Sequence, residues 1–161
     1  MPTTLQHRIG KKQPFELPEE EAYLNLIRTA ALLECDFHRL FAAHGLSEAT
    51  YNTLRILRGA GAAGRTGAQI RDHLVAPASD VTRLVERLEQ MQLVERARSA
   101  EDGRVIVNRI TPKGRRVLAK LDQPVKELHA SQLGHMSKTE LEQMSRLLER
   151  AREKRESERS E

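Results

Sequence analysis

The strongest constraint on the fold of this chain is a change of hydrophobic periodicity between residues 66 and 110. Residues 77–91 repeat apolar side chains at the spacing of a helix, as Val81, Leu84, Val85, Leu88 and Met91. Residues 93–98 and 104–110 then alternate in the manner of strands around the five-residue loop 99–103. The pattern predicts an amphipathic helix followed by a two-stranded hairpin.

A short helix is expected just before this pair. Thr66 and Gln69 have the spacing of a capping box, and Ile70 and Leu74 follow on one face. Pro77 is suited to begin the longer helix, because its missing N–H costs nothing in a first turn. A short helix, a tight turn and a longer amphipathic helix form the helix-turn-helix arrangement.

Longer helices are predicted on both sides. Pro18 and the three glutamates after it start a helix that should stop at Gly45. That helix carries two apolar stripes and therefore needs two packing partners. The stripes are Leu26, Ala30, Leu33, Phe37 and Phe41, and Leu24, Ile27 and Ala31.

Further helix boundaries follow from local signals. Ser47 caps a second helix that ends in a loop at residues 59–64, where three glycines oppose regular structure. Pro112 starts a helix that Pro124 should kink or interrupt, because proline removes a hydrogen bond. A last helix begins near Ser137, and from Arg146 onward we expect a solvated, fraying tail.

The fold class predicted is mainly α with a small β-hairpin, in which a helix-turn-helix and the hairpin that follows it lie between longer N- and C-terminal helices. The predicted organisation is an N-terminal flexible arm (1–18), a long helix (19–45), a helix-turn-helix domain with its hairpin (46–111), further helices (112–152) and a charged tail (153–161).

Composition excludes several classes of protein. Apolar residues make up 39% of the 161 residues, with no run long enough for a membrane span and no apolar segment typical of a secretory signal. One cysteine makes neither an internal disulfide nor a cysteine metal cluster. We therefore expect a soluble, cytoplasmic protein without a cofactor or metal. No nucleophile–base pair or paired carboxylates indicate an enzyme.

The charge is localised. Residues 65–116 hold 11 basic and 7 acidic side chains, so this central third accounts for the whole net charge of +4. A concentrated basic segment is the first feature expected of a phosphate-binding surface. The alternative is an arginine-rich solvated face.

The polar face of the 77–91 helix suits the major groove of DNA. It presents Ser79, Thr82, Arg83 and Arg87. Arginine donates in pairs to guanine or grips phosphates, and the hydroxyls bond base edges or backbone oxygens. An ordinary surface helix with Arg–Glu pairs remains the alternative.

Arginines also gather on the hairpin, at Arg96, Arg98, Arg104 and Arg109. An arginine near a loop tip suits a narrow minor groove, and Asp102 is placed to hold the Arg104 side chain extended. The alternative is an edge hairpin kept soluble by its charge.

Four motifs in one register resemble those of MarR-type winged-helix regulators. They are Val81–Glu89, Leu93–Arg96, Asp102-Gly103-Arg104 and Ile110–Gly114, and the resemblance extends over roughly residues 19–152. One departure concerns Gln92, which stands where the family usually has glycine. The helix is therefore expected to end without a left-handed cap or to run slightly longer.

The resemblance implies a homodimeric transcription factor, usually a repressor, that binds a palindromic operator in double-stranded DNA. It also implies that residues 46–111 are a winged helix-turn-helix DNA-binding domain and that the helices at 19–45 and 112–152 are dimerisation helices. Carried over by position, Arg83 and its neighbours would read the major groove. Arg104 would enter the minor groove with Asp102 orienting it. The rival hypothesis is a winged-helix module whose basic face binds an acidic protein partner.

Many proteins of this type release DNA when a small phenolic ligand or an oxidant binds. Phe37, His38, Phe41 and Tyr51 are candidates for an aromatic effector pocket, although such spacing is more often plain core. Cys35 lies mid-helix, where a buried small hydrophobe is the expected outcome, so a redox role is not favoured. The histidines show no i, i+4 pair for a metal.

Overall fold

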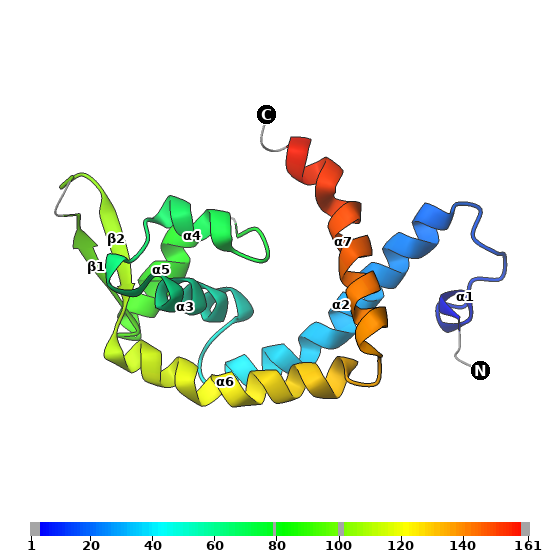
Figure 1. Cartoon of the computed structure of the whole chain (residues 1–161), viewed down its shortest axis with the longest axis horizontal. Coiled ribbons are helices and arrows are strands. Elements are labelled where there is room, and N and C mark those ends of the chain that lie inside the picture. Colours follow the sequence, from blue (N-terminus) through cyan, green and yellow to red (C-terminus); the bar gives the residue numbers. More distant parts are fainter. Residues whose placement is uncertain (1–3, 79, 100–101, 159–161) are drawn as a thin grey trace. The chain divides into compact units, whose positions relative to one another are not determined.

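The computed structural model describes residues 4–78, 80–99 and 102–158. Figure 1 shows a mainly helical chain with an antiparallel hairpin, which confirms the predicted fold class. The elements in chain order are α1 (Leu5–Arg8), α2 (Pro18–Ala42), α3 (Glu48–Ala60), the 3-10 turn η1 (Gly61–Ala63), α4 (Gly67–His73), α5 (Val81–Gln90), β1 (Val94–Arg98), β2 (Ile106–Ile110), α6 (Pro112–Leu133) and α7 (Lys138–Glu158).

The chain divides into two compact units within α6, after Pro124. The first unit contains α1 to α5, the hairpin, the first part of α6 and a buried aliphatic core. The second begins at Val125 and contains the rest of α6 together with α7. The most deeply buried core side chains of the first unit are Leu54, Leu57, Ile70, Leu88, Leu93, Leu118 and Leu121.

Helix α2 has the predicted start and stop. Pro18 occupies its first turn with three glutamates, where the helix macrodipole favours negative charge. The chain leaves the helix through Gly45, whose φ of +72° is the left-handed conformation that favours glycine. At this end of α2, Phe41 is buried against α3.

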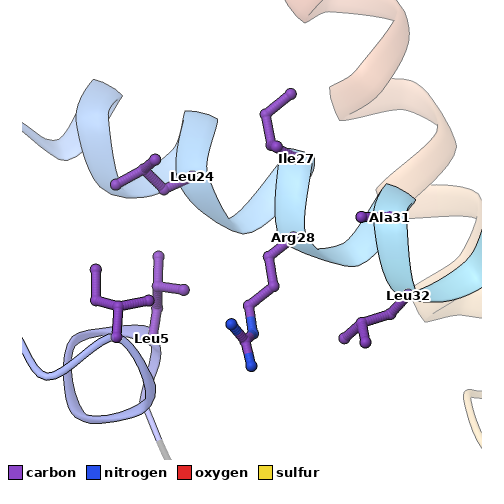
Figure 2. Close-up of a pocket in the computed structure, with 7 residues that line it drawn as sticks. Leu5, Leu24, Ile27, Arg28, Ala31 and Leu32 are labelled. Atoms are coloured by element: carbon purple, nitrogen blue, oxygen red, sulfur yellow. The ribbon is translucent and has the colours of Figure 1, made fainter.

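Residues 1–18 contain a helix that the periodicity of the sequence did not predict. Within the segment expected to be an arm, α1 packs on α2 and Leu5 is buried. Figure 2 shows Leu5 facing Leu24 of α2. A single turn is too short to register as a periodic pattern, so its contact with α2 is what orders it.

The predicted cap at Ser47 and the predicted capping box at Thr66 are confirmed, and the Ser47 cap also forms a capping box. Ser47 and Thr50 begin α3, and Thr66 and Gln69 begin α4, each with the reciprocal pair of side-chain bonds. The loop predicted at 59–64 begins later than expected, because α3 continues through Gly59 and Ala60. A glycine in a helix costs only about 1 kcal/mol relative to alanine, which burial of Leu57 offsets.

The prediction that Pro77 begins the longer helix is wrong. Helix α5 begins at Val81, and Asp80 is its N-cap, since its carboxylate accepts a hydrogen bond from the Arg83 backbone N–H at 3.0 Å. An aspartate cap satisfies an otherwise unpaired donor, which favours a start here. The predicted site residue Ser79 lies outside the described residues.

The hairpin pairs β1 with β2 in the register Val94↔Ile110 to Arg98↔Ile106. The second strand begins at Ile106, two residues after the predicted start. A further bridge joins Arg65 to Asn108 and adds a third extended segment beside β2. The hairpin is therefore fixed to the chain between α3 and α4.

The C-terminal helices continue past the points where the sequence predicted a break. Pro124 was expected to kink or interrupt its helix, and the interruption is wrong, because α6 continues through Pro124 to Leu133. Helix α7 starts at the predicted Ser137–Glu140 capping box and continues to Glu158, and residues 149–158 of it are exposed, as expected of a solvated tail. Same-face ion pairs such as Arg152–Glu156, at 3.3 Å, support these charged turns.

Candidate nucleic-acid interface

Helix α5 has one buried and one exposed face. Val81, Val85 and Leu88 are buried against the first unit's core, and α5 contacts α3, α4 and β1. Thr82, Arg83 and Arg87 are exposed on the outward side. The predicted reading residues that the structure describes on this helix are thus brought to one solvent-facing surface.

Arg83 is accompanied by a carboxylate that the sequence reasoning missed. Its Nε lies 3.0 Å from Oδ2 of Asp80, while the side chain remains 86% exposed. The signal was present as an aspartate three residues before an arginine at a helix start. Asp80 therefore caps α5 and also holds the Arg83 guanidinium near the helix N-terminus.

Arg87 is directed toward the turn between α2 and α3. Its Nη2 donates to the Gly45 carbonyl at 3.3 Å, although the residue is exposed. The contact joins α5 to the chain just before α3. This bond is long, so Arg87 can exchange it for a bond to a phosphate or a base. The same side chain can therefore contribute to packing in the free protein and to binding in a complex.

Arg96 bridges the helix and the hairpin. Its Nη1 lies 3.4 Å from a carboxylate oxygen of Glu89 and 3.9 Å from one of Glu86. Only 27% of its side chain is exposed. Arg109 is also used internally, because its Nε donates to the Ala62 carbonyl at 2.7 Å. Two of the four hairpin arginines thus brace the hairpin.

The other two hairpin arginines, Arg98 and Arg104, are exposed. Asp102 is also exposed, and its Oδ1 accepts a hydrogen bond from the Arg104 backbone N–H at 2.9 Å. Among the described residues, no ion pair joins the Asp102 carboxylate to the Arg104 guanidinium. Asp102 therefore shapes the turn, which also closes through a bond from the Val105 N–H to the Asp102 carbonyl.

The extended segment at Arg65 fixes the base of the hairpin. The Arg65 carbonyl accepts from both the backbone N–H of Asn108, at 2.8 Å, and its side-chain amide, at 2.9 Å. Asn108 is buried, so these bonds satisfy donors that would be costly to leave unpaired. Gly64 precedes this segment with a φ of +68°.

The C-terminal end of α5 differs from the expectation. Gln92 itself adopts the left-handed conformation, with a φ of +63°. The Leu93 N–H donates to the Leu88 carbonyl at 2.9 Å, and the Gln92 N–H donates to the Glu89 carbonyl at 2.8 Å. These two bonds define a Schellman motif, so the helix keeps the left-handed cap without a glycine.

Aromatic rings join α2 to α3. Phe41 stacks on Tyr51 with centroids 4.1 Å apart, and Phe37 lies 5.9 Å from Phe41. Phe41 and Tyr51 are buried, whereas His38 is exposed. Burial raises the pKa of the Tyr51 phenol. The four candidate effector residues therefore comprise two core rings, one half-buried ring and one surface histidine.

An ion pair joins α3 to α6 beside these rings. Both guanidinium Nη atoms of Arg58 donate to the Asp122 carboxylate, at 2.8 and 2.9 Å. This bidentate bond raises the pKa of Arg58. Sixty-four residues separate the partners, and the pair links α3, the helix before the helix-turn-helix, to the first half of α6.

Cys35 is exposed, which corrects the expectation that it is buried. The contact of α2 with α3 is made instead by Phe41, which stacks on Tyr51. Across the described ranges, no group of three His, Cys, Asp or Glu side chains is arranged to hold a metal ion. Within the same ranges, no helix is both long enough and apolar enough to cross a membrane.

The helix-turn-helix, the pendant hairpin and their exposed arginines define a winged-helix domain of the DNA-binding class. A sequence model of the MarR family matches residues 44–105. A MarR transcription factor from Planctomyces limnophilus is 39% identical and aligns over 84% of this chain and 98% of its own, with a TM-score of 0.65. Given this likeness, the chain belongs to the MarR family of transcriptional regulators, which are DNA-binding proteins and not enzymes.

Two further relatives are more distant. The HTH-type transcriptional repressor IacR of Pseudomonas putida is 30% identical over 82 residues, which are 51% of this chain. The match spans about half of that repressor, 49% of its length. Bordetella bronchiseptica BpsR, solved in a study of DNA-binding regulation by 6-hydroxynicotinic acid, is 20% identical with a TM-score of 0.75. It aligns over 88% of this chain and 99% of its own and shares the fold.

Proposed function

We propose that this protein is a homodimeric repressor that binds a palindromic operator, with α5 in the major groove and the hairpin at the minor groove. The observation that carries the proposal is the outward face of α5. Thr82, Arg83 and Arg87 are exposed there, while the opposite face of the helix is buried. An α-helix fits the major groove, where arginine discriminates guanine.

The hairpin supports the same arrangement. Arg98 and Arg104 are exposed, and the bonds of Asp102 and Asn108 hold the strands and the turn in a fixed shape. An arginine presented on a braced turn suits the negative potential of a narrow minor groove. In this proposal Asp102 positions Arg104 through its backbone.

Dimerisation is supported by apolar side chains of α2 that are exposed in the first unit. Tyr23, Leu26 and Ile27 of α2 are 61%, 43% and 50% exposed. Beside them, α1 and α2 line an apolar hollow of about 370 Å³, which includes Leu5, Leu24 and Ile27 (Figure 2). Single exposed apolar residues are normal on a protein surface, but a contiguous group of them marks an interaction site. A second copy of the chain would cover this group.

Helix α7 also supports dimerisation. It has 21 residues and none of those described is buried, although Leu141, Met144, Leu147 and Leu148 recur on one face. Such a helix is not expected to be stable in water without a packing partner. A second copy supplies one, and two bound half-sites would also compensate for the modest charge of a single chain.

The dimer is tested by sedimentation or light scattering. Ile27→Glu and Leu147→Glu should each shift the protein toward monomer, because a charge is placed on a surface that must be desolvated. Thr29→Glu adds the same charge elsewhere on α2 and should leave the assembly unchanged. A monomeric wild type, or variants that dimerise as strongly as wild type, would contradict the proposal.

DNA reading is tested by fluorescence anisotropy on promoter DNA next to the protein's own gene and on a scrambled duplex. Arg83→Ala should weaken cognate binding by about 1–3 kcal/mol and relax the preference for the cognate site. Arg104→Ala should weaken binding most where the flanking sequence is A·T-rich. Both variants binding like wild type would refute the assignment. Tight binding to an acidic protein without DNA discrimination would favour the rival module.

We also propose that a small aromatic effector releases the protein from DNA through the rings Phe37, Phe41 and Tyr51, with His38 at their edge. BpsR has the same fold, and 6-hydroxynicotinic acid regulates its binding to DNA. The ring stack lies where α2 meets α3, so a change there reaches the helix-turn-helix. Titrating aromatic acids, beginning with 6-hydroxynicotinic acid, against the DNA complex tests this, with Phe37→Ala as the matched variant.

A further inference from the structure

The end of α5 is joined to the start of α6 by a compact set of hydrogen bonds. Three consecutive carbonyls after the last turn of α5 accept bonds from two residues at the start of α6. Thr111 donates its hydroxyl to the Gln92 carbonyl at 2.8 Å and its N–H to the Leu93 carbonyl at 3.0 Å. The Lys113 Nζ donates to the Met91 carbonyl at 2.9 Å.

Close backbone packing surrounds these bonds. The Thr111 hydroxyl also accepts from the Gly114 N–H at 3.1 Å, which caps the first turn of α6. A Cβ on Gly114 would lie 2.4 Å from the Leu93 carbonyl oxygen, so only glycine permits this approach. The two helix ends are thus held in one relative position.

Lys113 is a cation at the start of a helix, where a positive charge is unfavourable. It lies in the first turn of α6, which contains no acidic residue and where the macrodipole disfavours a cation. Its ammonium instead reaches the C-terminal end of α5, the end at which a cation is favourable. It also donates to the side-chain Oε1 of Gln92 at 3.2 Å.

We propose that Lys113 is a positioning residue for α5, which holds the C-terminal end of the reading helix against the first turn of α6. The left-handed Gln92 presents its backbone and side-chain oxygens to Thr111 and Lys113, respectively. A movement of α6 is therefore transmitted to the helix that meets the DNA bases. The inference rests on the proposed role of α5.

Lys113 is exposed and basic, so direct contact with a phosphate is the competing explanation. The two roles differ in their dependence on salt. A lost phosphate contact weakens binding to every sequence and lowers the slope of log affinity against log salt by about 1. A lost positioning contact weakens cognate binding selectively, because base contacts need the correct helix orientation, and leaves the slope unchanged.

The experiment is an anisotropy titration of the full chain on the promoter duplex and a scrambled duplex at several salt concentrations. Lys113→Met should lower cognate affinity by roughly three- to tenfold, with scrambled binding and both slopes unchanged. Lys113→Arg should restore cognate affinity, because the guanidinium also donates to carbonyls. Lys120→Met, which removes an exposed charge seven residues further along α6, is the control and should not change the affinity ratio.

An equal loss on both duplexes with a smaller slope would overturn the inference in favour of phosphate contact. An unchanged affinity ratio in Lys113→Met would overturn it as well. If the wild-type protein did not distinguish the two duplexes, the proposed function itself would fail, and this result is separate from the other two. Thermal unfolding of each variant verifies that the ratio is measured on folded protein.

Discussion

Gly64→Ala should destabilise the winged domain strongly. Gly64 has φ +68° and ψ −166°, a region that is essentially restricted to glycine and costs other residues about 1–3 kcal/mol. An added Cβ would also lie 2.5 Å from the Asn108 carbonyl oxygen, 2.7 Å from Cγ1 of Val107 and 2.8 Å from Cγ of Arg109.

Relaxation is opposed because the closest atom is held in place. The Asn108 carbonyl accepts from the Arg65 N–H at 3.0 Å, so moving it breaks the bridge that fixes the hairpin. Forcing an extra carbon into such a space costs about 1–3 kcal/mol in addition to the backbone term. We therefore expect the free energy of unfolding to fall by about 3 kcal/mol or more. The corresponding fall in midpoint temperature is about 10 °C.

The assay is thermal and urea unfolding followed by circular dichroism. Gly59→Ala is the matched control, because Gly59 lies within α3 and an added Cβ there meets nothing within 4 Å. This control should raise stability by up to about 1 kcal/mol, since alanine is the better helix former. A Gly64→Ala protein within 1 kcal/mol of wild type would refute the reasoning.

Three further predictions concern helix ends and helix contacts. Gln92→Gly should raise the free energy of unfolding by about 1 kcal/mol in urea titrations, because it relieves a left-handed residue; a loss of stability would contradict this. Arg58→Met should lower it by about 1 kcal/mol, since a half-exposed bidentate bond to Asp122 is lost; an unchanged midpoint would contradict this. Hydrogen bonds from Ser137 lower the pKa of Glu140, so the ionised form stabilises the start of α7 above pH 4.5 and this support is lost as the pH falls. Acid titration of helicity should lose that component in Glu140→Gln, and identical curves would count against it.

The sequence predicted features whose causes are local. Ser47 was recognised as a cap, and Thr66 and Ser137 as the starts of capping boxes, because each signal is complete within four residues. The amphipathic face of α5 and the alternation of the hairpin were equally local. These signals suffice for the fold class and for most of the exposed residues of the candidate interface.

Features that depend on distant partners were missed. The bridge from Arg65 to Asn108 joins residues that are 43 apart in the sequence. A single bridging residue is too short to show a periodic pattern. Helix α1 is a single turn whose order depends on α2. The left-handed Gln92 was missed for a related reason, because burial of Leu88 and Leu93 and the bonds from Thr111 override the local preference for glycine.

In the candidate interface, the sequence also did not predict which arginines are exposed and which are used in packing. Residue type alone did not distinguish Arg96, which braces the hairpin through Glu86 and Glu89, from the exposed Arg98. Their difference depends on which carboxylates the fold brings near each guanidinium. Such pairings become visible only with the packing of α5 on β1.

Footprinting of the promoter DNA next to the gene tests the central claim most directly, that the exposed face of α5 reads DNA sequence. We predict two symmetric protected half-sites with centres about one helical turn, 10–10.5 base pairs, apart. Protection should be lost in Arg83→Ala and absent on a scrambled duplex. Uniform protection of both duplexes, or protection that persists unchanged in Arg83→Ala, would contradict the claim.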